Sequence, residues 1–133
     1  MTTLERLEVD VQEAEARLHD LLDVGNRLDE ERRRLLFERQ TTDISAVRLV
    51  AIKSRLEQIK VDLPQAERQI EEQARIAQRA RNQANQAAAR LAGARRALEA
   101  VENPQPGTDV SEFSPATRRQ IATRARKAIK ELT

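Results

Sequence analysis

The stretch that decides the fold is residues 49–101, LVAIKSRLEQIKVDLPQAERQIEEQARIAQRARNQANQAAARLAGARRALEAV. Mostly apolar residues recur along it at spacings of three and four, and the phase holds over sixteen positions. A heptad pattern this persistent is typical of a long helix that packs through one stripe against another helix. The positions are Leu49, Ile52, Leu56, Ile59, Leu63, Ala66, Ile70, Gln73, Ala77, Ala80, Ala84, Ala87, Leu91, Ala94, Leu98 and Val101.

A second heptad pattern precedes it and predicts a helix over residues 4–39. It lapses twice, at Gly25 and Arg32. The segment QTTDIS, residues 40–45, is rich in turn and N-cap residues, and Asp43 or Ser45 can accept a hydrogen bond from the first amides of the next helix. The second helix is therefore expected over residues 44–102. The apolar positions of the first pattern are Leu4, Leu7, Val11, Ala14, Leu18, Leu21, Leu28 and Leu35.

Pro64 is the one flaw in the second pattern, because proline has no amide hydrogen and its ring clashes with the preceding turn. The heptad phase continues unchanged across it, which favours a kinked helix over a broken one. The alternative is a new helix capped by Asp62.

The segment ENPQPGTDVSEFSP, residues 102–115, ends the second helix, because two prolines and a glycine interrupt it. We expect a linker over residues 103–114. Ser114 followed by Pro115 is a helix start signal, a hydroxyl N-cap and then proline at the first helical position. The last segment, 115–133, is predicted to be a basic amphipathic helix. Its apolar face consists of Ile121, Ala125, Ala128 and Leu132, with Ala122 and Ile129 beside them.

The composition agrees with thin helical packing, because only two residues are aromatic and 35% are charged. The predicted fold class is all-α: a long antiparallel helical hairpin (coiled coil) over residues 1–102, with a short amphipathic C-terminal helix on a Pro/Gly linker. Paired positions are expected to sum to 84, which places Gly25 opposite Ile59 and Leu7 opposite Ala77. Residues 81–102 then extend beyond the first helix. The C-terminal helix, a second chain, or both together are expected to cover them.

Charge is unevenly distributed along the chain. Residues 1–31 carry a net charge of −7, whereas residues 74–98 carry +6 and residues 115–133 carry +5. An acidic beginning and a basic end complement each other between copies, so a homo-oligomer is expected.

The residue pattern argues against catalysis and cofactor binding. There is no cysteine, the single histidine, His19, lies beside the apolar stripe, and no catalytic, metal-ligand or phosphate-loop motif occurs. No catalytic, cofactor or metal residue is predicted. No run approaches the roughly 18 apolar residues that a membrane span needs. The N-terminal segment lacks the apolar core of a signal peptide, so a location in the cytoplasm or in an assembled particle is expected.

Two functions remain. The first is a non-enzymatic coiled-coil structural or assembly protein, scaffold- or adaptor-like, that self-associates and presents its basic C-terminal helix to a partner protein with an apolar groove and an acidic rim. The alternative is a helical protein that binds nucleic acid through segments 75–96 and 118–130. It lacks aromatic residues that would stack on bases. The predicted partner-binding residues are Arg118, Arg119, Ile121, Arg124, Ala125, Lys127, Ala128, Lys130 and Leu132. The predicted nucleic-acid or oligomer contacts are Arg75, Arg79, Arg81, Arg90, Arg95 and Arg96.

Overall fold

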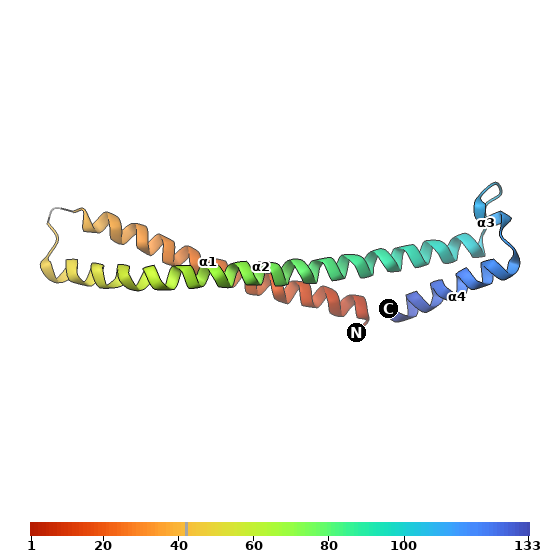
Figure 1. The fold of residues 1–133 in the computed structure, drawn as a ribbon, viewed down its shortest axis with the longest axis horizontal. Helices are drawn as coiled ribbons and strands as arrows, with labels where there is room; N and C mark the ends of the chain where they lie inside the picture. The colour runs from red at the N-terminus through yellow and green to blue at the C-terminus, as the bar shows by residue number, and fades with distance from the viewer. Residues whose placement is uncertain (42) are drawn as a thin grey trace. The chain divides into compact units, whose positions relative to one another are not determined.

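The computed structural model describes residues 1–41 and 43–133, and the regular structure within these ranges is entirely helical. The elements are α1 (Thr3–Arg39), α2 (Ala46–Glu102), α3 (Asp109–Glu112) and α4 (Pro115–Leu132), as Figure 1 shows. The all-α prediction is confirmed, and the three long helices begin and end within two residues of the expected positions. Sequence reasoning missed α3, a single turn that lies between α2 and α4.

Serine hydroxyl groups cap the N-terminal ends of two of the helices. The Arg48 amide donates to Ser45 Oγ at 3.1 Å, so Ser45 is the N-cap of α2. Thr42, which belongs to the expected turn, lies outside the described residues. At α4 the Thr117 amide donates to Ser114 Oγ at 3.2 Å and proline follows the cap, as the start signal predicts.

Helix α2 continues through Pro64, so the alternative of a second helix capped by Asp62 is wrong. Asp62 instead accepts a hydrogen bond from Gln58 Nε2 at 3.0 Å, one turn earlier in the same helix. Because residue 64 has no amide hydrogen, the Lys60 carbonyl lacks its usual helical donor.

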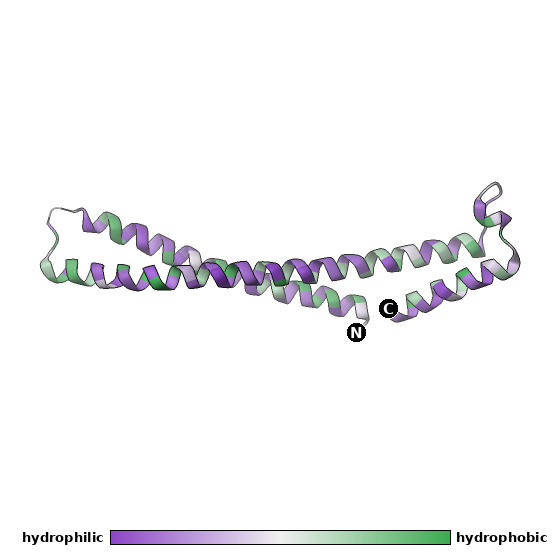
Figure 2. Ribbon diagram, viewed as in Figure 1, coloured by the Kyte–Doolittle hydropathy of each residue, from purple (hydrophilic) through white to green (hydrophobic). Residues whose placement is uncertain are grey.

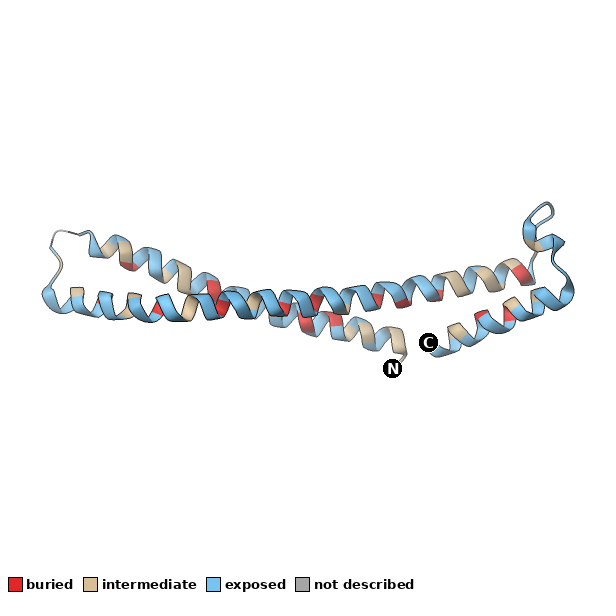
Figure 3. Cartoon of the chain, viewed as in Figure 1, coloured by how far each residue is buried: buried red, intermediate tan, exposed pale blue. Residues whose placement is uncertain are grey.

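The buried residues follow the predicted stripes. Every predicted apolar position of both heptad patterns is buried or half-buried, and of the two lapses Gly25 is buried while Arg32 is exposed. Figure 3 shows red and tan residues spaced along helices that are mostly exposed, and Figure 2 shows hydrophobic and hydrophilic residues alternating along the same helices. Each long helix therefore packs through one face.

The described chain divides into two compact units. Residues 13–78 form one, here called the loop unit because it contains the connection between α1 and α2. Residues 1–12 and 79–133 form the other, here called the terminal unit because it contains both ends of the chain. Helices α1 and α2 each contribute to both units.

Branched aliphatic side chains make the core of the loop unit. Leu35, Ile52 and Ile59 form a buried cluster, and the two isoleucines have no exposed surface. Gln73 is the buried polar residue of this unit, and its Nε2 donates to the Ala14 carbonyl at 3.0 Å. The half-buried side chains packed around the cluster are Leu28, Ile44, Leu56 and Leu63.

The predicted pairing of Gly25 with Ile59 is wrong. A Cβ atom placed on Gly25 would lie 3.0 Å from Ile70 Cδ1, so Gly25 faces Ile70. A heptad pattern matches itself at several registers, and the apolar positions alone do not choose among them. The observed contacts also do not share one register: the numbers of Gly25 and Ile70 sum to 95, whereas those of Ala14 and Gln73, which are joined by a hydrogen bond, sum to 87.

The terminal unit contains the start of α1, the last part of α2, and the whole of α3 and α4. Ala87, Leu91 and Leu132 form its buried cluster, and Thr3 Oγ1 donates to the Glu131 carbonyl at 2.8 Å. Figure 1 shows α4 alongside the last part of α2. The half-buried side chains packed against the cluster are Leu4, Leu7 and Ile129.

This cluster bears on what covers residues 81–102. Leu4 and Leu7 pack against the cluster that contains Ala87 and Leu91, so the expectation that the first helix does not reach these residues is wrong. The C-terminal helix also packs there, through Ile129 and Leu132.

Candidate interaction surfaces

The apolar face of α4 lies against its own chain. Ala122, Ala125 and Leu132 are buried, and Ile121, Ala128 and Ile129 are half-buried. Four of the predicted partner-binding residues thus belong to a face that the terminal unit already covers. They are Ile121, Ala125, Ala128 and Leu132.

The basic side chains of α4 mostly point away from that face. Arg124, Lys127 and Lys130 recur at a spacing of three residues, and all three are exposed. Arg119 is also exposed, whereas Arg118 is half-buried. The helix is therefore one-sided, with an apolar face inward and a cationic face in solvent.

All six arginines of the second predicted group are exposed. Arg75 belongs to the loop unit and the others to the terminal unit. Arg90 Nη2 approaches Glu131 Oε2 at 3.9 Å, but both side chains are more than half exposed, so this pair contributes little to stability. The remaining members are Arg79, Arg81, Arg95 and Arg96.

His19 is exposed, on the outer side of α1 as predicted. Its Nδ1 lies 3.6 Å from Asp23 Oδ2, and Asp20 brings a third ligand atom, all within 4.8 Å of one another. Residues four apart on a helix meet in this way without any ligand, and water reaches all three side chains.

Two bidentate ion pairs join α1 to α2 within the loop unit. Arg55 donates to Glu31 at 2.6 and 2.8 Å, and Arg48 donates to Glu38 at the same two distances. The hydrogen bond from Arg55 lowers the pKa of Glu31 below its ordinary value, although partial desolvation opposes this. Arg48 lowers the pKa of Glu38 in the same way.

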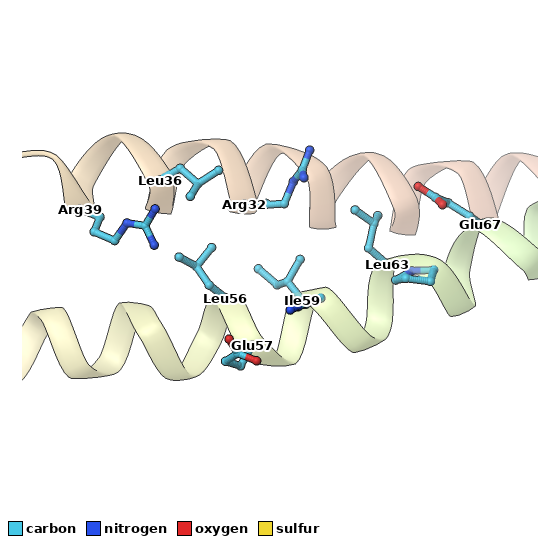
Figure 4. Close-up of a pocket in the computed structure, with 10 residues that line it drawn as sticks. Arg32, Leu36, Arg39, Leu56, Glu57, Ile59, Leu63 and Glu67 are labelled. Carbon is cyan, nitrogen blue, oxygen red and sulfur yellow. The ribbon is translucent and has the colours of Figure 1, made fainter.

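An apolar groove of about 390 Å³ lies between α1 and α2 in the loop unit. Figure 4 shows Leu36 and Leu56 directed toward one another from the two helices, with Ile59 and Leu63 farther along α2. Sequence reasoning missed Leu36, because it falls one position after the stripe residue Leu35. The groove's other lining residues are Arg32, Arg39, Glu57, Lys60, Pro64 and Glu67.

A second groove, of about 370 Å³, lies between the end of α2 and the start of α4 in the terminal unit. Arg118 is one of its lining residues, and no acceptor among the described residues pairs with the buried Nε of this side chain. No sequence signal indicates this groove, because its residues come from two segments that meet only in the folded unit. It is lined by Val101, Glu102, Arg118, Arg119, Ala122, Thr123 and Arg126.

Among the described residues, no helix combines the length and apolar character that crossing a membrane requires. No family model matches the chain, and no similar protein was found among curated proteins or solved structures.

Proposed function

We propose that this protein is a non-enzymatic structural or assembly protein that presents a basic helix to an acidic partner. In this proposal α1 and α2 form an antiparallel coiled-coil hairpin, residues 103–114 act as a linker, and α4 is the presented element. Recognition by an acidic surface matches what α4 offers to solvent, a row of basic side chains on a helix anchored from behind.

The observation that carries the proposal is the one-sidedness of α4. Arg124, Lys127 and Lys130 form no salt bridge with any described residue, so their charges are available to a partner. The apolar face is in contact with α2 and the start of α1. We therefore place docking on the cationic face, because insertion of the apolar face into a partner's groove would first require α4 to leave its own chain.

Self-association is the second part of the proposal. Phe37, Val47 and Val50 are 78%, 83% and 68% exposed at the end of the loop unit where α1 meets α2. Side chains of this size in solvent favour an interface with a second copy. The opposite charges of the N-terminal and C-terminal segments add long-range attraction that salt screens.

Light scattering at low and high salt tests self-association. We expect a dimer or larger species whose mass falls as salt rises, and whose formation weakens when Phe37 is changed to Glu. A protein that stays monomeric at high concentration and low salt contradicts this part of the proposal.

Charge reversal tests presentation by α4. We expect the triple variant R124E/K127E/K130E to lose binding to poly-L-glutamate, a substitute for an acidic protein surface. The matched control is K53E/K60E/R68E, which reverses three exposed cations of the loop unit. Equal loss in both variants means that net charge alone drives binding, and contradicts a role for α4.

Nucleic-acid binding is the alternative, favoured by the exposure of all six arginines of the segment 75–96. In that case duplex DNA should bind at low salt with an affinity that falls steeply as salt is added, and R79E/R95E/R96E should weaken it more than K53E/K60E/R68E does. Absence of DNA binding at low salt removes this function.

A further inference from the structure

We propose that two copies of this chain pair in antiparallel fashion through the side of α2 that faces away from α1. The inference rests on the self-association proposed above and names its interface and direction. That side of α2 carries Val47, Val50 and Val61, and the last of these is 57% exposed. All three belong to the loop unit and lie in the first part of α2.

The valines point away from the core contacts of α2. Val50 lies two residues before Ile52 and is therefore turned about 200° from it around the helix. Val61 lies two residues after Ile59 and is turned from it by the same angle. Both isoleucines pack with Leu35 of α1. A second α2 can therefore approach the valines without meeting α1 of the first copy.

The valines belong to a second heptad stripe on α2. Its positions follow one another at alternating spacings of three and four, and all of them are exposed. A stripe with this spacing is the pattern through which one helix packs along another. No described segment of the chain covers it. The positions are Val47, Val50, Ser54, Glu57, Val61 and Pro64.

This second stripe matches a copy of itself in one antiparallel register. When Val50 lies opposite Val61 of the second copy, the two polar residues Ser54 and Glu57 also lie opposite each other, and the two outermost positions, both apolar, meet as well. Each contact then occurs twice, as the two-fold symmetry of a dimer requires. The registers one heptad away on either side place Glu57 opposite a valine, which would bury its charge against an apolar side chain.

Charge also favours the antiparallel direction. Lys53 is exposed and adjacent to Ser54, so in this register its long side chain is within reach of Glu57 of the second copy. Neither Lys53 nor Glu57 forms a salt bridge with another described residue of its own chain. A parallel pair would instead place the two copies of Glu57 opposite each other, and like charges in contact oppose association.

Sedimentation equilibrium of the full chain tests the surface. The substitution Val61→Asp occurs twice in the dimer and should weaken dimerisation about tenfold or more, because it places a charge against Val50 of the second copy. Val24→Asp is the matched control, since it makes the same change at an exposed valine of α1 in the same unit and should leave dimerisation unchanged. Circular dichroism checks that both variants keep their helix content.

Disulfide cross-linking tests the direction of the pair, because the chain has no cysteine of its own. A mixture of Val50→Cys and Val61→Cys chains should form a disulfide between the two different variants. Val50→Cys alone should not cross-link, because its two copies would lie about 16 Å apart along the helices, whereas a disulfide joins Cα atoms roughly 4.4–6.8 Å apart. Val24→Cys mixed with Val50→Cys gives the background rate.

Three results overturn the proposal: cross-linking of Val50→Cys alone, which indicates a parallel pair, a rate in the mixture of Val50→Cys and Val61→Cys that does not exceed the background, or equal weakening in Val61→Asp and Val24→Asp. If the unchanged chain still forms a dimer, these results leave the proposed self-association standing and reject only this interface. An unchanged chain that is monomeric overturns both.

Discussion

The loop unit and the terminal unit continue the same heptad pattern but fill it with side chains of different size. In the loop unit the heptad positions of α2 include Ile52, Ile59 and Ile70, whereas four of the seven in the terminal unit are alanines, namely Ala80, Ala84, Ala87 and Ala94. Full burial of a leucine or isoleucine side chain contributes about 1.5–3 kcal/mol, and a methyl group about 0.8 kcal/mol. Heptad phase therefore predicts which face of a helix is buried, and side-chain volume decides how much that burial stabilises the fold.

The terminal unit offsets its smaller side chains with an additional helix. Both α4 and the start of α1 pack against α2 there, and they contribute Leu132, Leu4 and Leu7 to a cluster that α2 alone would leave thin. Alanine at the contact positions also lets helix backbones approach closely. The heptad stripe of α2 is thus covered by one helix in the loop unit and by two segments in the terminal unit.

The largest expected difference between the units lies in their cores. Ile59→Ala should lower the free energy of unfolding by about 2–5 kcal/mol, because the site is fully enclosed and a cavity would remain. Leu132→Ala should cost about 2 kcal/mol, the lower end of that range, because it lies at the end of α4 where neighbours can relax. Urea denaturation followed by circular dichroism measures both, and a larger loss in Leu132→Ala would reverse the comparison.

A smaller difference is expected at the two helical glycines. Gly93→Ala in the terminal unit should stabilise the protein by about 0.5–1 kcal/mol, because alanine favours the helix and the added Cβ meets nothing within 4 Å. Gly25→Ala in the loop unit should gain less, because its Cβ would press on Ile70 Cδ1 at 3.0 Å. Thermal denaturation of the two variants decides this, and an equal gain would mean that Ile70 accommodates the added Cβ without cost.

The smallest effect is a pH dependence of the loop unit. The hydrogen bond from Arg55 makes the pKa of Glu31 lower in the folded protein than its ordinary value of 4.5. The ion pair therefore adds to the free energy of unfolding above that pH, and this stabilisation is lost as the pH falls below it. Glu31→Gln should therefore make stability less sensitive to acid. Urea midpoints measured on either side of the ordinary glutamate pKa test this. Glu57→Gln, which alters an exposed glutamate of the same unit, serves as the control, and an equal flattening in both variants would contradict a role for the Arg55 pair.

Much of the fold could be predicted from the sequence, because burial follows heptad phase and helix ends follow local residues such as Ser114 and Pro115. The register could not be predicted, because a heptad pattern matches itself at several registers and the apolar positions alone do not choose among them. The packing of α4 on its own chain also could not be predicted, because the apolar face of an amphipathic helix can pack equally well on its own chain or on a partner. The groove at Arg118 depends on α2 and α4 meeting, which no local pattern contains.

Hydrogen exchange of the backbone amides tests most directly the claim that α4 and the start of α1 cover the alanine-rich part of α2 in the terminal unit. We predict that α4 amides are protected, but about tenfold or more less than amides between Ile52 and Ile59, which corresponds to a difference of about 1.4 kcal/mol in opening free energy. Amides of α4 that exchange as fast as an unfolded chain, or as slowly as the loop-unit core, would contradict this account.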